Sequence, residues 1–95
     1  MDDFVREHGC TEAEWLGWLP RAVHGHAWTR PHAQGAVVDL GEGTLALDWQ
    51  VLPPRRIALL NLPRLAVRYR FEGVPADLRE RFLKRFDLHL QRGGG

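Results

Sequence analysis

The chain has 95 residues, of which 44% are hydrophobic and 26% are charged, and its formal net charge is +1. This length suits one hydrophobic core, so we expect a single α+β domain over residues 1–92 and a flexible glycine tail over 93–95. No run approaches the roughly 18 apolar residues of a membrane span, and the first residues lack the apolar region of a signal peptide. We therefore expect a cytoplasmic protein that has no membrane partner.

The first predicted element is a helix that begins after Thr11. Thr11 and Glu14 have the spacing of a capping box, in which the two side chains satisfy free N–H groups of the first turn. Trp15 and Trp18 follow on one face of this helix, and Pro20 is expected to end it. We interpret the tryptophans as core residues, and the alternative is a partly exposed aromatic patch for a ligand or partner.

Residues 21–29 predict a weak edge strand in which His24, His26 and Trp28 share one face. Two histidines on one face of a strand are able to reach the same metal ion, and His32 would be a third ligand. This gives a metal-binding hypothesis. The alternative is that the histidines lie on an ordinary solvated strand face, and we expect no cofactor.

A hairpin is predicted next. Apolar residues alternate with others over 36–40 and again over 45–51, and the glycine-rich stretch 41–43 between them is typical of a hairpin loop. Pro53 and Pro54 are expected to end the second strand, because proline cannot donate a hydrogen bond to a β-ladder.

The clearest strand signal lies over 65–71, where every second residue is large and apolar and the residues between include Arg68 and Arg70. The short apolar run 57–60 lies between prolines that favour extended backbone, so it predicts a partner strand. Asn61 is the expected turn residue between the two. Together these segments predict an antiparallel β-meander of four to five strands.

The chain turns at Gly73 and Pro75 into its longest predicted helix, which starts at Ala76 and ends near Phe86. Its apolar residues recur at every fourth position and would pack on the sheet. The predicted fold class is therefore α+β in two layers, with a short N-terminal helix, the antiparallel meander, and a C-terminal helix packed on one sheet face.

Charge is distributed unevenly. Residues 1–52 hold three arginines and eight acidic residues, whereas 53–95 hold ten basic and four acidic residues. If the basic side chains share a face, they form a surface for an anion or an acidic partner. The candidate binding residues are Arg55, Arg56, Arg64, Arg68, Arg70, Arg79, Arg81 and Arg85. The alternative is that these charges solvate the fold and pair with the acidic N-terminal half.

Candidates for catalysis are few. The chain contains no serine, and its single cysteine, Cys10, excludes an internal disulfide and a multi-thiolate zinc site. Asp39 and Asp48 fall on the two strands of the predicted hairpin and would face each other as a carboxylate pair, although both are expected on a solvated face. We predict no catalytic residues and no enzyme activity.

The C-terminus, from Arg92 to Gly95, resembles the exposed Gly-Gly tails of ubiquitin-like and sulfur-carrier proteins. This resemblance implies a carrier whose terminal carboxylate is activated by adenylation. Those folds end on a strand that leads into the tail, whereas a helix is the last element predicted for this chain.

The sequence favours a small non-catalytic binding or adaptor domain that acts through protein contacts or through an anionic ligand on an arginine-rich face. The partner would be another protein or a second copy of the chain. The alternatives are a nucleic-acid-binding protein, a histidine-based metal-binding protein and a C-terminal-glycine carrier.

Overall fold

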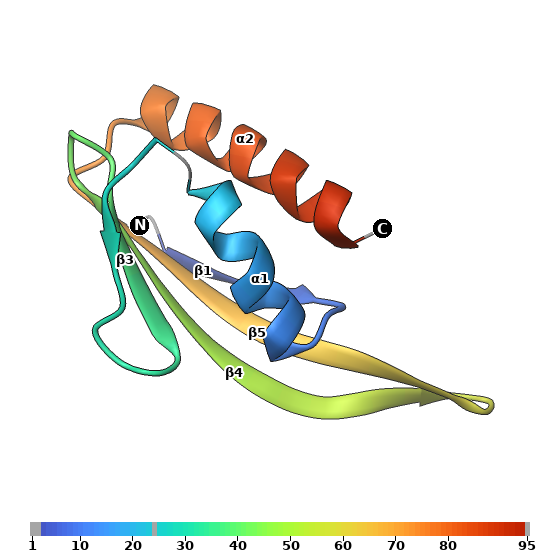
Figure 1. Ribbon diagram of the computed structural model, residues 1–95. Helices are drawn as coiled ribbons and strands as arrows, with labels where there is room; N and C mark the ends of the chain where they lie inside the picture. Colours follow the sequence, from blue (N-terminus) through green and yellow to red (C-terminus); the bar gives the residue numbers. More distant parts are fainter. Residues whose placement is uncertain (1–2, 24, 95) are drawn as a thin grey trace.

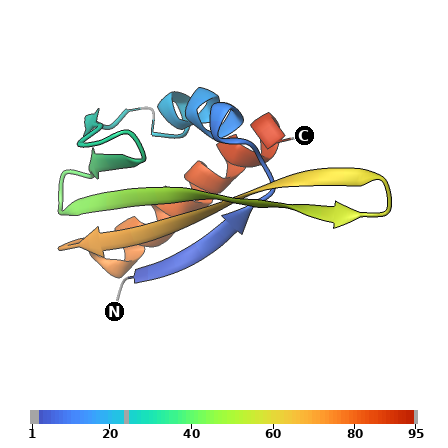
Figure 2. The ribbon, with the colours of Figure 1, turned by 90° about the horizontal axis from the view of Figure 1, so that it is seen from below.

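The computed structural model describes residues 3–23 and 25–94 of the chain, with side chains up to residue 90. A five-stranded antiparallel sheet, in the order β1-β5-β4-β3-β2, forms one layer, and both helices cover the same face of it (Figures 1 and 2). The elements are β1 (Asp3–His8), α1 (Glu12–Ala22), β2 (Trp28–Thr29), β3 (Gly35–Asp39), β4 (Thr44–Ile57), β5 (Leu60–Glu72) and α2 (Ala76–Gly94). The predicted two-layer α+β fold is confirmed.

The edge strand β1 was not predicted. It pairs with β5 from Asp3 opposite Arg70 to His8 opposite Leu65, so the N-terminus completes the sheet on the side away from β4. Its Phe4 ring stacks on Tyr69 with the ring centroids 4.9 Å apart. β1 therefore brings the acidic start of the chain next to the arginines of β5.

Helix α1 begins as predicted and ends later than predicted. The backbone N–H of Glu14 donates to Thr11 Oγ1 (3.1 Å), and the N–H of Thr11 donates to a carboxylate oxygen of Glu14 (2.9 Å), which confirms the capping box. The helix continues through Pro20 to Ala22, so the expected end at Pro20 is wrong. Proline removes one hydrogen bond from the last turns, but burial of Ala22 and Val23 fixes those turns against the core.

The predicted strand over 21–29 is wrong for most of its length. Its first two residues belong to α1, and only Trp28 and Thr29 are extended, as β2 beside β3. A longer ladder is prevented by the end of the helix and by Gly25, whose positive φ of 90° is not that of an extended strand. His24 lies outside the described residues.

The hairpin of β4 and β5 is much longer than the sequence suggested. β4 passes through Pro53 and Pro54, so the expected break there is wrong. The register shifts at this point from Leu52 opposite Arg64 to Arg55 opposite Leu62, so the two prolines face the single residue Pro63. This is a β-bulge, and it leaves residues without an N–H outside the regular ladder.

The turn of this hairpin is also displaced from its predicted place. It is formed by Ala58 and Leu59, and Ala58 takes a φ of +54°. Asn61, the expected turn residue, lies within β5 opposite Arg56. The short run 57–60 is therefore the end of β4, the turn and the start of β5, and it is not a separate strand.

Helix α2 extends past the predicted end near Phe86 and includes Gly93 and Gly94. Gly95 lies outside the described residues, and the flexible tail over 93–95 stays a prediction. Phe82, Phe86 and Leu90 are buried against the sheet and α1, which extends the apolar stripe by one further turn. In the described part of the chain, no helix is long and apolar enough to cross a membrane.

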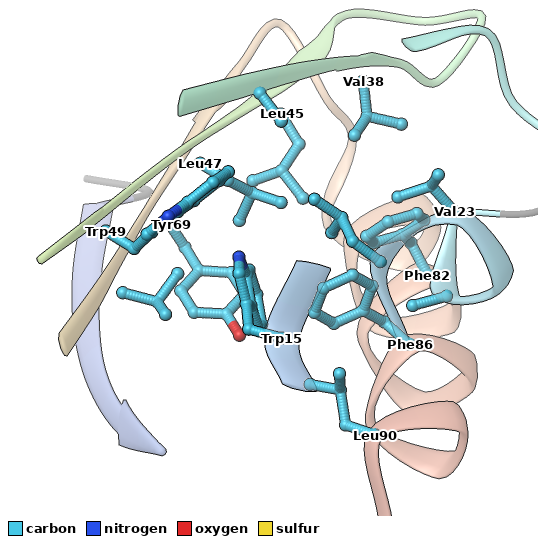
Figure 3. Close-up of a cluster of buried hydrophobic side chains, with 14 of the residues drawn as sticks. Trp15, Val23, Val38, Leu45, Leu47, Trp49, Tyr69, Phe82, Phe86 and Leu90 are labelled. Atoms are coloured by element: carbon cyan, nitrogen blue, oxygen red, sulfur yellow. The ribbon is translucent and has the colours of Figure 1, made fainter. Parts of the chain in front are cut away.

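The core lies between the sheet and the two helices, and Trp15 is at its centre (Figure 3). The Trp15 side chain is 0% exposed and makes edge contacts with Trp49 (5.6 Å) and Phe86 (6.1 Å). The interpretation of Trp15 as a core residue is therefore confirmed, and Trp18 packs against the core in a partly buried position. The inward face of β5 is buried as predicted, including Val67 and Tyr69.

We predict that Val67→Asp unfolds the protein or lowers its unfolding free energy by several kcal/mol, because Val67 is fully buried and the new carboxylate would have no partner there. The matched control is Val5→Asp, the same chemical change at a side chain that is 64% exposed. Urea denaturation followed by tryptophan fluorescence measures both. A stable Val67→Asp variant beside an unfolded Val5→Asp variant would mean that the two sheet faces are assigned in reverse.

Candidate functional site

The arginines proposed from the sequence do not form one surface. Arg64, Arg68 and Arg70 project from the sheet face opposite the helices, since their neighbours along β5 are buried beneath α1 and α2. Arg79, Arg81 and Arg85 lie on α2 in the other layer. Arg55 and Arg56 lie near the end of the β4–β5 hairpin. The eight residues are thus divided among three places.

The arginines on the open sheet face are paired with carboxylates of the N-terminal half. Arg68 donates to Asp3 (2.7 Å), Arg70 to Asp48 (3.3 Å), and Arg64 lies 3.4 Å from Glu7. The hydrogen bond from Arg68 holds the pKa of Asp3 below its usual value. This arrangement supports the interpretation that these charges neutralise each other across the sheet.

The α2 arginines lie beside the end of α1. Arg81 and Arg85 line a shallow depression of about 240 Å³ with His26. Arg81 also lies 3.6 Å from Asp77, and both side chains are strongly exposed. Arg79 places its guanidinium 5.9 Å from the centre of the Phe71 ring. These are solvated contacts on a helix surface, and such ion pairs contribute little to stability.

The described residues form neither a metal site nor a carboxylate pair, and the metal candidate His24 lies outside them. Within residues 3–23 and 25–94, no three His, Cys, Asp or Glu side chains are grouped closely enough to hold a metal ion. Asp39 is opposite Thr44 and Asp48 is opposite Gly35, so the two carboxylates do not face each other, and that prediction is wrong. Asp39 instead accepts a hydrogen bond from the N–H of Gly41 and so shapes the loop.

The remaining metal candidates have other contacts. The Nε2 atom of His32 lies 3.2 Å from a carboxylate oxygen of Asp48. The His26 ring packs against Phe82 with a centroid distance of 5.5 Å. Both histidines therefore serve local contacts at different places on the fold.

The most distinctive surface feature is the projecting end of the β4–β5 hairpin, residues 52–64, which we call the arm. β3 pairs with β4 only as far as Asp48, and β1 pairs with β5 only from Leu65 onward. Beyond those positions the two strands pair only with each other. Figures 1 and 2 show the arm extending past both helices, which gives the molecule dimensions of 46 × 24 × 23 Å.

The arm exposes large apolar side chains. Seven such side chains are exposed in the described part of the chain, and four of them lie on the arm. They are Ile57, Leu59, Leu60 and Leu62, and Leu59 at the tip is 100% exposed. A patch of this kind on a projecting ribbon is typical of a surface that binds another molecule.

Strand pairing places three of these residues on one face of the arm. Ile57 is opposite Leu60 and Arg55 is opposite Leu62, and residues directly opposite each other point to the same face. This face therefore combines an apolar strip with one guanidinium. Arg56 lies on the other face, opposite Asn61.

The edges of the arm are poorly suited to pairing with another strand. Pro53, Pro54 and Pro63 have no N–H to donate, and charged Arg55 and Arg56 follow the bulge. Prolines, bulges and charges of this kind are known protections against edge-to-edge pairing. The arm is therefore suited to recognition through its side chains.

A mostly apolar hollow of about 400 Å³ lies at the base of the arm, against the β1–α1 loop. Cys10, Glu12, Val51, Leu52, Pro54 and Pro63 are among its lining residues. The Glu12 carboxylate accepts a hydrogen bond of 2.8 Å from the indole N–H of Trp49, which fixes it at the rim. Burial raises the pKa of the Cys10 thiol to about 11, so this thiol remains protonated and unreactive at neutral pH.

A second polar cluster joins β1 to the core and to α2. His8 Nε2 lies 2.9 Å from the Tyr69 hydroxyl, and Arg6 forms an ion pair of 2.6 Å with Asp87. Burial, followed by the nearby Arg6 charge, lowers the pKa of His8, and burial raises the pKa of Tyr69. These groups hold the edge strand in place.

The apolar residues of the arm were missed by the sequence reading, which assigned 57–60 to an ordinary sheet strand. One signal was available, because Ile57 to Leu62 contains apolar residues at both odd and even positions without the polar alternation of a half-buried strand.

Comparison of the chain with models of known protein families gives no match, and comparison with curated protein sequences gives no significant match.

We predict that stability falls as the pH drops below about 6.5, the ordinary pKa of histidine. The pKa of His8 is lower in the folded protein, so the unfolded chain takes up the proton first and protonation favours unfolding. The contribution of neutral His8 to the free energy of unfolding is fully present above pH 6.5, and it is lost as the pH falls from 6.5 to the lower pKa of His8 in the folded protein.

Urea midpoints measured across this pH range test the prediction. The His8→Gln variant should lack this decline, whereas the control His89→Gln, which changes a half-buried residue of α2, should retain it. An identical decline in all three proteins would exclude His8 as its cause.

Proposed function

We propose that this chain is a non-catalytic binding module that recognises a protein partner with its arm. The observation that carries this proposal is the set of four large apolar side chains on a ribbon with no other part of the described chain packed over its tip. Fully burying one such side chain contributes about 1.5–3 kcal/mol. Covering the arm with a partner would therefore supply a substantial favourable free energy.

The chemistry of the arm favours a protein over a nucleic acid. Its tip is aliphatic, and it carries no aromatic residue on which a base would stack. The arginines of the open sheet face are engaged by carboxylates, which weakens them as phosphate ligands. The buried centre of a protein–protein contact is more apolar than the rest of the surface, and arginine is enriched in such contacts.

The arm is also prepared for binding. Its strands continue directly from the buried halves of β4 and β5, and the three prolines at its base restrict the backbone. A binding segment that is already ordered loses less conformational entropy on association. The partner surface that fits is an apolar groove with carboxylates at its rim.

We propose a module without catalytic activity because the side chains that could act as catalytic groups are either buried or engaged in local contacts. The Cys10 thiol and the Tyr69 hydroxyl are buried, and their pKa values are raised, which disfavours the reactive anions. The carboxylates of Asp39 and Asp48 are on different parts of the sheet surface and are engaged locally.

We predict that the double variant Leu59→Asp, Leu60→Asp loses its protein partner and keeps its fold, because Leu59 is fully exposed and Leu60 is mostly exposed. Tagged protein is used to capture partners from cells that naturally contain it, and bound proteins are identified by mass spectrometry. The matched control is Leu88→Asp, since Leu88 is a leucine exposed by 50% on α2 and far from the arm in sequence. Circular dichroism spectra of all the variants are used to check that each one is folded.

A second comparison separates the arm from the open sheet face. The Arg68→Glu, Arg70→Glu variant reverses the paired charges there and should retain the partner. If this variant loses the partner and the arm variant retains it, the binding surface is the arginine-bearing sheet face and the arm proposal is wrong.

A further inference from the structure

We infer that the partner of the arm is a second copy of this chain, in a two-fold dimer whose arms lie antiparallel. In this arrangement the tip of each arm enters the hollow at the base of the other arm. The inference rests on the proposed function, because it gives the identity of the protein that the arm binds.

Both halves of such a contact are present on one molecule. The tip offers Leu59 and Leu60, and the hollow offers the apolar surfaces of Val51, Leu52 and the neighbouring prolines. Val51 is 53% exposed, so the hollow is itself incompletely covered. When two arms lie antiparallel, each tip reaches the other base at the same time. A two-fold axis therefore satisfies both contacts and closes the assembly.

The charges of the two ends are complementary. Arg55 and Arg56 lie next to the tip, and neither has an ion-pair partner among the described residues. Glu12 lines the hollow, and so does Arg64, whose charge is already paired with Glu7. A tip in the hollow of another copy brings Arg55 and Arg56 close to the Glu12 carboxylate.

The blocked edges of the arm favour this mode of association over sheet extension. The three prolines and the bulge lie at the base, where two arms would otherwise pair strand to strand. Side-chain packing of tip against hollow does not require those missing N–H groups. It also covers the exposed leucines, which strand pairing at an edge would leave in water.

Sedimentation velocity of the purified full chain over a range of concentrations tests the inference directly. We expect a dimer that dissociates on dilution. The variant Leu59→Asp, Leu60→Asp should raise the dimer Kd by about a hundredfold or more, because two leucines in each of two tips are no longer buried. Leu88→Asp and Val5→Asp, at exposed positions outside the arm, should leave the Kd within about threefold of the original value.

Disulfide trapping tests the antiparallel arrangement. In a Cys10→Ala background, the paired variant Leu59→Cys, Val51→Cys should form a covalent dimer on mild oxidation. A bond within one chain is excluded, because β4 runs about 20 Å from Val51 to Ile57 before the turn that holds Leu59, and a disulfide needs Cα atoms within about 7 Å. Leu59→Cys alone and Val51→Cys alone should cross-link far less, because the two tips lie at opposite ends of the dimer.

The outcomes distinguish this inference from the proposed function. A chain that remains monomeric at all concentrations overturns the inference, and if its arm variants still lose a captured protein, the arm binds a different partner. A dimer that the arm variant does not weaken overturns the inference as well, because another surface then forms it. Efficient cross-linking by Leu59→Cys alone would replace the tip-to-base arrangement with a tip-to-tip one.

Discussion

The β-bulge at Pro53 and Pro54 is the constraint on which the shape of this molecule depends. Two residues without N–H groups face Pro63, so no ladder hydrogen bond is lost from a regular position. Pairing then resumes with Arg55 opposite Leu62 and continues to the turn. If the prolines ended the strand, the chain beyond Leu52 would have no ladder to join, and the leucines of the tip would have no fixed position in space.

The sheet also brings together the opposite charges that the sequence concentrates in its two halves. The acidic N-terminal half supplies Asp3 and Glu7 on β1 and Asp48 on β4, and these strands lie on either side of the arginine-bearing β5. Opposite charges that are far apart in the sequence thus become neighbours on the open face. The other basic residues of the second half of the chain lie on the arm and on α2, and on the arm Arg55 shares the face of the apolar strip whereas Arg56 lies on the opposite face.

Local signals in the sequence predicted the elements that local chemistry determines. The capping box at Thr11, the glycine loop before Thr44 and the buried face of β5 could all be predicted. β1 could not, because its apolar residues Phe4 and Val5 are adjacent and show no strand-like alternation, and because its stability comes from contacts with Tyr69 and α2, far away in the sequence. The arm was missed for a related reason. Proline usually ends a strand when only the local sequence is considered, but pairing with the partner strand β5 lets β4 continue past it.

The arm combines two properties that oppose each other in an isolated chain. Its leucines favour burial, so an uncovered arm would promote nonspecific association. Its prolines and arginines prevent the commonest form of such association, the addition of strands at an open edge. A sequence that retains exposed leucines and also blocks strand addition is suited to one defined contact through side chains. The hollow beside Glu12 has an apolar lining and a carboxylate that match the tip, and this match is why the second copy of the chain is the partner we infer.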